Sequence, residues 1–466
     1  MAYAHYDRLS SLDATFLTIE SPSVHMHVGA VAVFEGGETE VPDLEKLKEL
    51  SASTLGRTPR LRQRLEPVPG LDHWVWVDDD RFQIEYHLRH TALPQPGDTR
   101  QLKRLAGRIF SQKLDMHRPA WEMWLVEGLE DGGFALISKM HHCMVDGISG
   151  VNLIGSMLAG ASQPQTEEHR WLARPRPTTR QLVRDELAHR ATLPARAMGA
   201  GIRALGKPIE SLREARRTAT AVGHTLTAAG GSASPTPLND PIGPYRRFDW
   251  LSMDRASLNE VRERFGATLN DVVLAIVSGA MRSFLARRGL DVDRIDFRAM
   301  VPVSRRTEDE RGKLGNRVIS LVAKLPVGEP DPSRRVVRVC EAMGDLKQSD
   351  LAEGNDAMMA FADASLTTLV AQFARFAARA RAYNMVVTNV PGPRDGLELL
   401  GARLSELYPL VPLFSNQALG IALFTYDGQL FWGLNADWDA VPDLHEVVDF
   451  LAEELALLRK AEGVKP

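Results

Sequence analysis

The chain has 466 residues, of which 44% are hydrophobic and 25% charged, the average composition of globular proteins. This composition excludes a chain that is disordered throughout and a collagen-like polymer, and the formal net charge of −4 gives no reason to expect nucleic-acid binding. The two cysteines, Cys143 and Cys340, match no zinc spacing and indicate a reducing compartment.

The N-terminus lacks the charged and apolar segments of a secretion signal. The longest apolar run, Val272–Met281, is far shorter than the roughly 20 residues of a membrane-spanning helix. We therefore expect a cytoplasmic protein that can touch a membrane from one side without crossing it.

The hydrophobic periodicity of the first 160 residues predicts a mixed α/β lobe, because runs that alternate with period 2 stand between helical repeats. The predicted strands are Val24–Glu35, Trp74–Val77, Phe82–Leu88, Trp121–Leu129 and Phe134–His142. The predicted helices are Asp43–Gly56, Thr99–Leu114 and Ile148–Leu158.

The composition then shifts. Residues 161–220 contain twelve Lys or Arg and six Asp or Glu, a local charge of +6 in a molecule whose remainder carries −10. We interpret 161–244 as a partly helical basic connector that ends in a loop rich in Gly and Pro. It is either an ordinary solvated helix pair or a basic face that meets anionic lipid headgroups.

Residues 245–466 predict a second mixed α/β lobe. Its predicted strands are Arg247–Met253, Phe297–Val303, Val318–Leu325, Met385–Val390 and a hairpin, Ala418–Tyr426 with Leu430–Asp437, that turns at Asp427-Gly428. Its predicted helices are Thr268–Arg287, Ser333–Leu346, Ala357–Ala378 and Leu444–Leu458, the first of which opens with a capping box. Trp432 and Trp438 are expected to be core residues.

The segment Ser138–Ile148 carries the pattern HHxxxDG, formed by His141, His142, Asp146 and Gly147, where a predicted strand ends before a helix. Adjacent strand residues point to opposite faces, so the two histidines cannot easily share one metal or one substrate. We expect one histidine to face a reaction chamber and the other to be packed inside. Each residue alone is explained as a core histidine or a turn residue, but the four residues together favour catalysis.

HHxxxDG is the signature of CoA-dependent acyltransferases whose two lobes resemble chloramphenicol acetyltransferase. The chain resembles more closely the bacterial wax ester synthase/diacylglycerol acyltransferase family, and the resemblance covers nearly its whole length. It is carried by Leu9–Phe16, Thr268–Leu274, Val301–Arg305, Gly315–Arg317, Thr388–Pro393 and Asn416–Asp437. One departure is Pro119-Ala120-Trp121, where the family commonly has Pro-Leu-Trp, which should widen the substrate channel near Pro119 and Trp121.

The resemblance implies that His142 is the general base, which takes the proton from an alcohol hydroxyl as the oxygen attacks an acyl-CoA thioester. His141 and Asp146 then hold the loop and the base, and Gly147 permits close approach of the backbone. Cys143 is a competing nucleophile, but it lacks a separate partner histidine in the sequence.

Further site residues are expected from both lobes. Asn270, in the first turn of a capped helix, matches the family's Asn-Asp pair and is a candidate donor to the tetrahedral intermediate, although Asn270 and Asp271 can also be mere capping residues. Asp271 is a candidate for substrate binding. Candidates for the CoA phosphates are Arg305, Arg306 and Lys313, which can equally form a solvated charge cluster.

The sequence therefore predicts a two-lobed α/β acyltransferase with its site in a tunnel between the lobes. Acyl-CoA and either diacylglycerol or a long-chain alcohol are the expected substrates, with no cofactor and no metal, and a membrane or lipid droplet is the expected surface. Two alternatives remain: an acyltransferase of the same superfamily that acts on a polyketide or glycolipid hydroxyl, and a non-catalytic lipid-droplet-binding protein.

Overall fold

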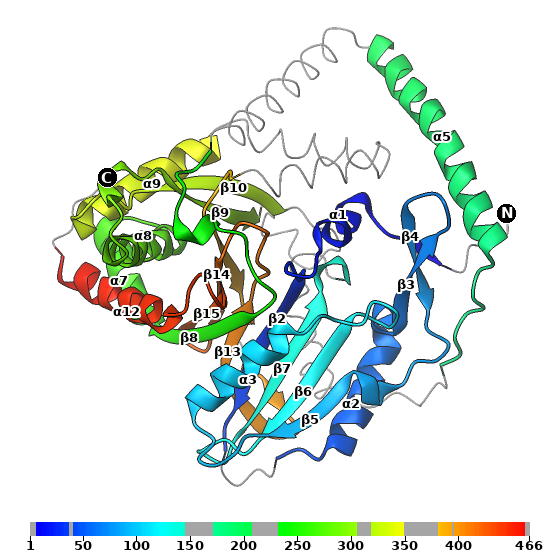
Figure 1. Cartoon of the computed structure of the whole chain (residues 1–466), viewed down its shortest axis with the longest axis horizontal. Helices are drawn as coiled ribbons and strands as arrows, with labels where there is room; N and C mark the ends of the chain where they lie inside the picture. Colours follow the sequence, from blue (N-terminus) through cyan, green and yellow to red (C-terminus); the bar gives the residue numbers. More distant parts are fainter. Residues whose placement is uncertain are drawn as a thin grey trace.

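In the computed structural model the chain forms two lobes that lie side by side (Figure 1). Each lobe is built on a six-stranded sheet, and a third sheet of three strands flanks the N-terminal lobe. The predicted mixed α/β, two-lobed fold class is confirmed. The structure describes residues 6–36, 41–144, 171–206, 232–304, 318–348, 381–393 and 396–461.

The N-terminal sheet has the strand order β12-β13-β2-β7-β6-β5. Its two central strands are antiparallel, with His27 of β2 opposite His141 of β7. The whole of β7 is buried, and apolar residues of α2 and α3 share its core cluster. The elements of this lobe are β2 (His27–Phe34), α2 (Leu44–Arg57), β5 (Leu88–Ala92), α3 (Thr99–Ser111), β6 (Trp121–Glu127) and β7 (Phe134–His141).

One edge of the N-terminal sheet comes from the C-terminal half of the chain. Strand β13 (Ala402–Leu410) pairs antiparallel with β2, and β12 (Glu398–Leu399) follows it at the edge. The predicted division at residue 245 places this segment in the C-terminal lobe, whereas it crosses over and completes the other sheet. The reason is that pairing with β2 buries both strands, and such a long-range partner leaves no mark on local periodicity.

The C-terminal sheet has the strand order β10-β9-β11-β14-β15-β8, in which β11 runs parallel to both of its neighbours. The predicted hairpin β14–β15 is confirmed, and its turn residues Asp427 and Gly428 both have positive φ, 44° and 74°. The strands are β8 (Arg246–Asp254), β9 (Phe297–Ser304), β10 (Val318–Leu325), β11 (Met385–Pro391), β14 (Leu419–Tyr426) and β15 (Gln429–Asp437).

Helix α8 (Leu269–Arg287) is the core helix of the C-terminal lobe. By length and apolar composition it could cross a membrane, but it is largely buried in the fold, and no second described helix meets the same test. It packs against α7 (Arg255–Phe265), α9 (Pro332–Gln348) and α12 (Leu444–Lys460) (Figure 1). A helix that is enclosed by other elements is apolar all round, so burial accounts for its composition.

The lobes meet where α3 packs on β8. Gly107 of α3 makes this close approach possible, because a Cβ at this position would lie 3.1 Å from the carbonyl oxygen of Arg246. On the other side, Lys139 of β7 is fully buried and donates to the carbonyl oxygens of Ile109 (2.9 Å) and Gln112 (2.6 Å), at the end of α3. Helix α3 therefore contacts both the central strand β7 of the N-terminal lobe and the edge strand β8 of the C-terminal lobe.

Two predictions from the sequence are wrong. The segment Phe82–Leu88 is no strand, because Ile84–Tyr86 forms a short 3-10 turn at the surface and β5 begins only at Leu88. Trp438 is 46% exposed rather than in the core, and its ring lies under the Arg247 guanidinium at 3.8 Å. Trp432, by contrast, is fully buried as expected. The predicted helices Ile148–Leu158 and Ala357–Ala378 lie outside the described residues.

Part of the predicted basic connector is the long helix α5 (Thr179–Gly206), which extends away from the lobes in Figure 1. It is attached near its N-terminal end to the small sheet, where Leu182 packs with apolar residues of β3 and β4. The small sheet consists of β1 (Asp7–Arg8), β4 (His73–Asp78) and β3 (Gln63–Val68).

Candidate active site

The two motif histidines lie where β7 ends and a 3-10 turn, His142–Met144, begins. The strand holds them firmly: the His141 N–H donates to the Ala120 carbonyl oxygen (2.8 Å), and the His142 N–H donates to the Met26 carbonyl oxygen (2.7 Å). Asp146 and Gly147 lie outside the described residues, so their expected bracing roles stay predictions.

His141 is the packed member of the pair, with none of its surface exposed. Its Nδ1 accepts the backbone N–H of Cys143 (3.2 Å), and because a backbone N–H can only donate, the ring proton belongs on Nε2. Nε2 lies 3.9 Å from the Glu20 carboxylate, beyond hydrogen-bond distance. Burial, with a smaller effect of His142, lowers the pKa of His141 to about 3, so it stays neutral.

His142 is the free member of the pair and is partly exposed. Its ring stacks on Phe16 of α1 (Ser11–Ile19), with the centroids 3.9 Å apart and the planes at 27°. Burial lowers its pKa to about 4, which keeps the imidazole neutral and able to accept a proton. Its Nδ1 has no hydrogen-bond partner among the residues that the structure describes. His141 is thus the packed histidine of the pair and His142 the more exposed one, and the expectation that His142 faces a reaction chamber stays a prediction.

Cys143 has a histidine partner that the sequence did not reveal. Its Sγ lies 2.9 Å from Nδ1 of His141, so the expectation that it lacks one is wrong. Yet the side chain is 3% exposed, and burial together with the charges of Asp13 and Glu20 raises the pKa of the thiol well above its usual range. A buried, protonated thiol is a poor nucleophile, so the contact serves to orient His141.

Two further buried histidines, His25 and His27, lie on the side of the packed His141 and were not predicted. His27 is 2% exposed and lies opposite His141 in the sheet, and the rings of His25 and His27 are 5.4 Å apart. Burial, helped by the charge of Lys139, lowers the pKa of both, that of His25 to about 4. The alternation His25-Met26-His27 in a predicted strand was the signal, because it places both imidazoles on one face.

The predicted residues of α8 lie in the cap at the start of this helix. Thr268 and Asp271 form the expected capping box: the Asp271 carboxylate accepts the Thr268 N–H (2.9 Å), and the Thr268 hydroxyl accepts the Asp271 N–H (3.2 Å). Asn270 is half-buried in the same first turn. No hydrogen bond among the described residues joins Asn270 to either motif histidine, so its role as a donor to the intermediate stays a prediction.

Pro119 and Trp121 lie beside the motif, and Trp121, which pairs with Met140, is on the opposite face of the sheet from His141. Trp121 is 2% exposed, donates from Nε1 to the Leu61 carbonyl oxygen (2.8 Å) and stacks on His87 at 4.6 Å. Both residues line a cavity of about 260 Å³ that also includes Arg118. The N–H of the packed His141 is bonded to Ala120, the residue between Pro119 and Trp121. The strand pair β6–β7 therefore lies between His141 and this cavity.

The remaining expected ligands of CoA, namely Arg305, Arg306 and Lys313, follow the end of β9 and lie outside the described residues. Within the part of the chain that the structure describes, no group of three or more His, Cys, Asp or Glu side chains could hold a metal ion. The chemistry of the described site is that of a neutral imidazole with an available nitrogen, suited to general base catalysis.

Comparison with protein families agrees with this chemistry. The model of the wax ester synthase/diacylglycerol acyltransferase catalytic domain matches residues 9–273, and that of the WS/DGAT C-terminal domain matches residues 314–459. Two Mycobacterium tuberculosis proteins named as diacylglycerol O-acyltransferases, Rv1760 and tgs1, are each 32% identical to the chain. The matches cover 100% of this chain and 92% of Rv1760, and 97% of this chain and 96% of tgs1.

Solved structures show the same architecture. A wax ester synthase/diacylglycerol acyltransferase from Marinobacter aquaeolei VT8 matches with a TM-score of 0.70 and 26% identity, over 98% of this chain and all of that one. The starter condensation domain of rhizomide synthetase, a mutant in complex with C8-CoA and Leu-SNAC, matches with a TM-score of 0.59 and 14% identity, over 98% of this chain and 96% of that one. The second likeness concerns the fold alone.

Proposed function

The chain belongs to the wax ester synthase/diacylglycerol acyltransferase family and is an acyltransferase, and we propose that it transfers the acyl group of acyl-CoA to diacylglycerol or a long-chain alcohol, with His142 as the general base. The observation that carries the assignment of the base is the contrast within one dipeptide. His141 is buried and bonded on Nδ1, whereas His142 is partly exposed and its Nδ1 has no hydrogen-bond partner among the described residues.

The reaction needs no covalent acyl-enzyme. His142 accepts the hydroxyl proton as the alcohol oxygen attacks the thioester carbonyl carbon, which gives a tetrahedral intermediate with a negative oxygen. As this collapses, the C–S bond breaks and the imidazolium returns the proton to the departing CoA sulfur. The ester and free CoA are the products, and the base ends in its starting state.

The neutral row His25, His27 and His141 supports this step. A positive charge next to His142 would make its protonation harder, and the burial of all three side chains keeps them uncharged near neutral pH. The imidazolium that forms on His142 is therefore the one new charge among these four rings.

An acceptor panel tests the function. We expect the purified protein, with one long-chain acyl-CoA, to release CoA in the presence of diacylglycerol or hexadecanol and to form the corresponding ester. Release that requires a polyketide or glycolipid hydroxyl instead would favour the first alternative. No CoA release with any acceptor, together with binding to lipid droplets, would favour the non-catalytic alternative.

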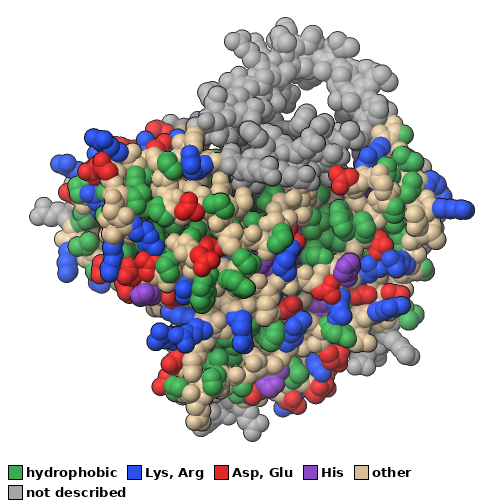
Figure 2. Space-filling model, viewed as in Figure 1, with side chains coloured by type: hydrophobic (Ala, Val, Ile, Leu, Met, Phe, Trp, Pro, Cys, Tyr) green, Lys and Arg blue, Asp and Glu red, His purple; other side chains and the backbone are tan. Residues whose placement is uncertain are grey.

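We also propose that α5 attaches the enzyme to an anionic membrane or lipid-droplet surface, where its water-insoluble substrates reside. Arg180 is exposed, Arg184 has 70% of its side chain exposed, and Leu187 is 52% exposed beside them. Acidic and basic side chains are interspersed over the face of the lobes that Figure 2 shows, so this face offers no comparable basic stretch. Basic residues and exposed apolar residues on one helix suit an interfacial role.

Neutralising arginines of this helix should weaken membrane binding. Arg190 is unsuited to the test, because it is half-buried, paired with Glu186 (2.8 Å) and bonded to the Leu71 carbonyl oxygen. Arg184 is paired with the adjacent Asp185 (2.9 Å), but 70% of its side chain stays exposed. We expect the change of Arg180, Arg184, Arg196 and Arg203 to Gln to reduce sedimentation with phosphatidylglycerol vesicles about tenfold or more, since each charge contributes about 1 kcal/mol near such a surface.

The matched control removes the same charge elsewhere. Arg100, Arg104, Arg108 and Arg255 are exposed on the lobes, and their change to Gln should leave sedimentation largely intact. Both variants should keep activity on detergent-dispersed substrate. Equal loss of sedimentation in the two variants would show that only net charge matters, and no loss in either would remove α5 from membrane binding.

A further inference from the structure

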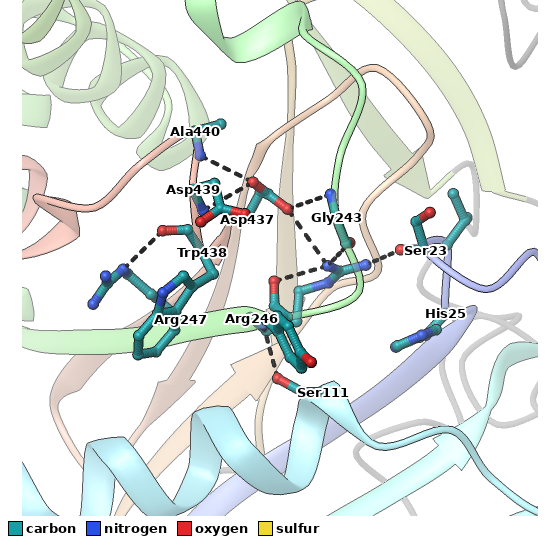
Figure 3. Close-up of polar contacts among 12 residues, drawn as sticks. Ser23, His25, Ser111, Gly243, Arg246, Arg247, Asp437, Trp438, Asp439 and Ala440 are labelled. Atoms are coloured by element: carbon teal, nitrogen blue, oxygen red, sulfur yellow. Dashed lines mark hydrogen bonds and ion pairs between the residues drawn. The ribbon is translucent and has the colours of Figure 1, made fainter.

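Arg246, the first residue of β8, is buried where the two lobes meet, with 3% of its surface exposed (Figure 3). Its backbone N–H donates to Ser111 Oγ at the end of α3 (2.8 Å). Its guanidinium donates to the carbonyl oxygens of Gly243 (2.7 Å) and Tyr245 (3.0 Å), and also to that of Ser23. One side chain of the C-terminal lobe is thus bonded to a backbone group of the N-terminal lobe.

Asp437, the last residue of β15, supplies the opposite charge and is held rigidly itself. Its Oδ2 lies 3.8 Å from Arg246 Nη1 and accepts the Gly243 N–H (2.8 Å). Its Oδ1 accepts the N–H groups of Asp439 (3.1 Å) and Ala440 (2.9 Å). Because three backbone bonds fix the carboxylate, the guanidinium beside it has one favoured position.

The carbonyl group that Arg246 holds belongs to a tight turn, Ser21–His25. Within it, Ser21 Oγ accepts the N–H groups of Ser23 (3.3 Å) and Val24 (3.1 Å), and the Ser21 N–H donates to the Val24 carbonyl oxygen (3.0 Å). The His25 ring is hydrogen-bonded to the Pro22 carbonyl oxygen (3.0 Å). A turn with so many internal bonds moves as one body.

Both groups that hold His142 flank this turn. Phe16, which stacks on the ring, lies on α1 just before it, and Met26, whose carbonyl oxygen accepts the His142 N–H, follows it directly. A displacement of Ser23 therefore shifts the ring support and the backbone support of His142 together.

We propose that Arg246, held by Asp437, is a positioning residue for the catalytic base: from the opposite lobe it fixes the turn Ser21–His25 and thereby sets the place and orientation of His142. This inference rests on the proposed role of His142 as the base. It makes the docking of the lobes a condition for catalysis, because the base of one lobe is aligned by a cation of the other.

The geometry requires an arginine. The guanidinium is a planar fork that reaches three carbonyl oxygens while facing a carboxylate, whereas lysine carries its charge on a single nitrogen. Burial lowers the pKa of Arg246 to about 10, which leaves it charged near neutral pH.

A second buried ion pair provides a matched control for stability. Arg335 and Glu454 are 2% and 4% exposed, 3.0 Å apart, and join α9 to α12 within the helical layer of the C-terminal lobe. Loss of this pair should destabilise the fold much as loss of the Arg246 pair does, but it has no connection to the turn Ser21–His25.

The test compares Arg246→Met, Arg246→Lys and Arg335→Met at a temperature where each variant is fully folded. We expect Arg246→Met to lower kcat by about 10- to 100-fold with little change in KM, as for a base displaced by about 1 Å. Arg246→Lys should recover part of the loss, and Arg335→Met should keep kcat within about twofold while its thermal midpoint also falls.

A pH profile supplies a readout that a merely structural role would not move. The titratable and charged groups around the motif segment are His141 and Cys143 on that segment, His27 opposite His141, Asp13 and Glu20 at α1, Arg60 before β3, and Lys113 after α3. A loosened turn should admit water to the ring, so kcat of Arg246→Met should fall between pH 8 and 6, where the wild-type kcat stays level.

The outcomes separate the two proposals. If His142→Ala abolishes turnover but Arg246→Met matches Arg335→Met in kcat and pH profile, the positioning role is wrong and the base assignment stands. If His142→Ala remains active, the proposed mechanism itself fails. Should Arg246→Met not fold, Asp437→Asn takes its place, because it removes the opposite charge and keeps the arginine; an unchanged kcat and pH profile would overturn the positioning role.

Discussion

Replacing His142 by alanine is expected to lower kcat by about 10²–10⁴, the usual contribution of a general base, while the protein stays folded. The ring is partly exposed and makes one stacking contact, with Phe16, so its removal should cost little stability. The hydrogen bond that fixes this residue runs from its backbone to Met26 and survives the substitution. Steady-state kinetics and a thermal melt on one preparation would measure both effects.

Two companion variants make this result specific. His142→Gln keeps a polar side chain of similar reach without a basic nitrogen, so it should be as inactive as the alanine variant. Cys143→Ala should retain most of the activity, because the thiol is buried and protonated and merely contacts His141. An inactive Cys143→Ala enzyme beside a nearly fully active His142→Ala enzyme would overturn the mechanism in favour of a cysteine nucleophile.

Much of the described fold could be predicted because its signals are local. The Asp427-Gly428 turn, the capping box at Thr268 and the alternation in β7 each depend on residues within one element. The same local rule gave the central feature of the site: successive strand residues point to opposite faces, so one histidine of the pair had to be packed when the other was available.

The features that could not be predicted depend on partners that are distant in sequence. Strand β13 completes the N-terminal sheet although it is 370 or more residues away from β2 in the sequence; Glu406, for example, lies opposite Val33. Nothing in the residue pattern of β13 indicates that β2 is its partner. Arg246 and Asp437 are likewise ordinary charged residues in the sequence and become a buried pair only when β8 pairs with β15.

The roles expected at α8 show where a motif alone is insufficient. Two roles were predicted for Asp271, helix capping and substrate binding. The structure shows its carboxylate bonded to the Thr268 N–H in the capping box. A capping residue can still affect catalysis indirectly, but no hydrogen bond among the described residues joins Asp271 to the motif histidines. For Asn270 the sequence pattern remains the sole support.

The second large effect we expect is acid unfolding at an unusually mild pH. His25, His27, His73 and His141 are each at most 4% exposed. Burial lowers the pKa of each: to about 4 for His25 and His73, to about 3 for His141, and well below 6.5 for His27. In the unfolded chain the same groups titrate near 6.5. Below that pH the unfolded state binds more protons than the folded state, so stability that is fully present above pH 6.5 is lost as the pH falls.

The size of the effect follows from the number of groups. Each such histidine costs roughly 1.4 kcal/mol of unfolding free energy at one pH unit below 6.5, so four lower it by about 5 kcal/mol at pH 5.5. That is comparable with the whole stability of many domains, about 5–15 kcal/mol. The carboxyls of Glu20 and Glu454 act in the opposite direction, because burial raises their pKa.

Denaturant unfolding between pH 8 and 5 would measure this loss, and His73 allows it to be assigned. His73 lies on β4, and neither of its ring nitrogens has a hydrogen-bond partner among the described residues, so His73→Leu removes a titrating group without breaking such a bond. This variant should lose about 1.4 kcal/mol less than wild type between pH 7.5 and 5.5, whereas His117→Gln, at an exposed position, should follow wild type. A free energy of unfolding that stays level down to pH 5.5 would show that the buried imidazoles are protonated at little cost. The neutral state of His25, His27 and His141 would then have to be abandoned, whereas the assignment of His142 as the base, which rests on its contrast with His141, would stand.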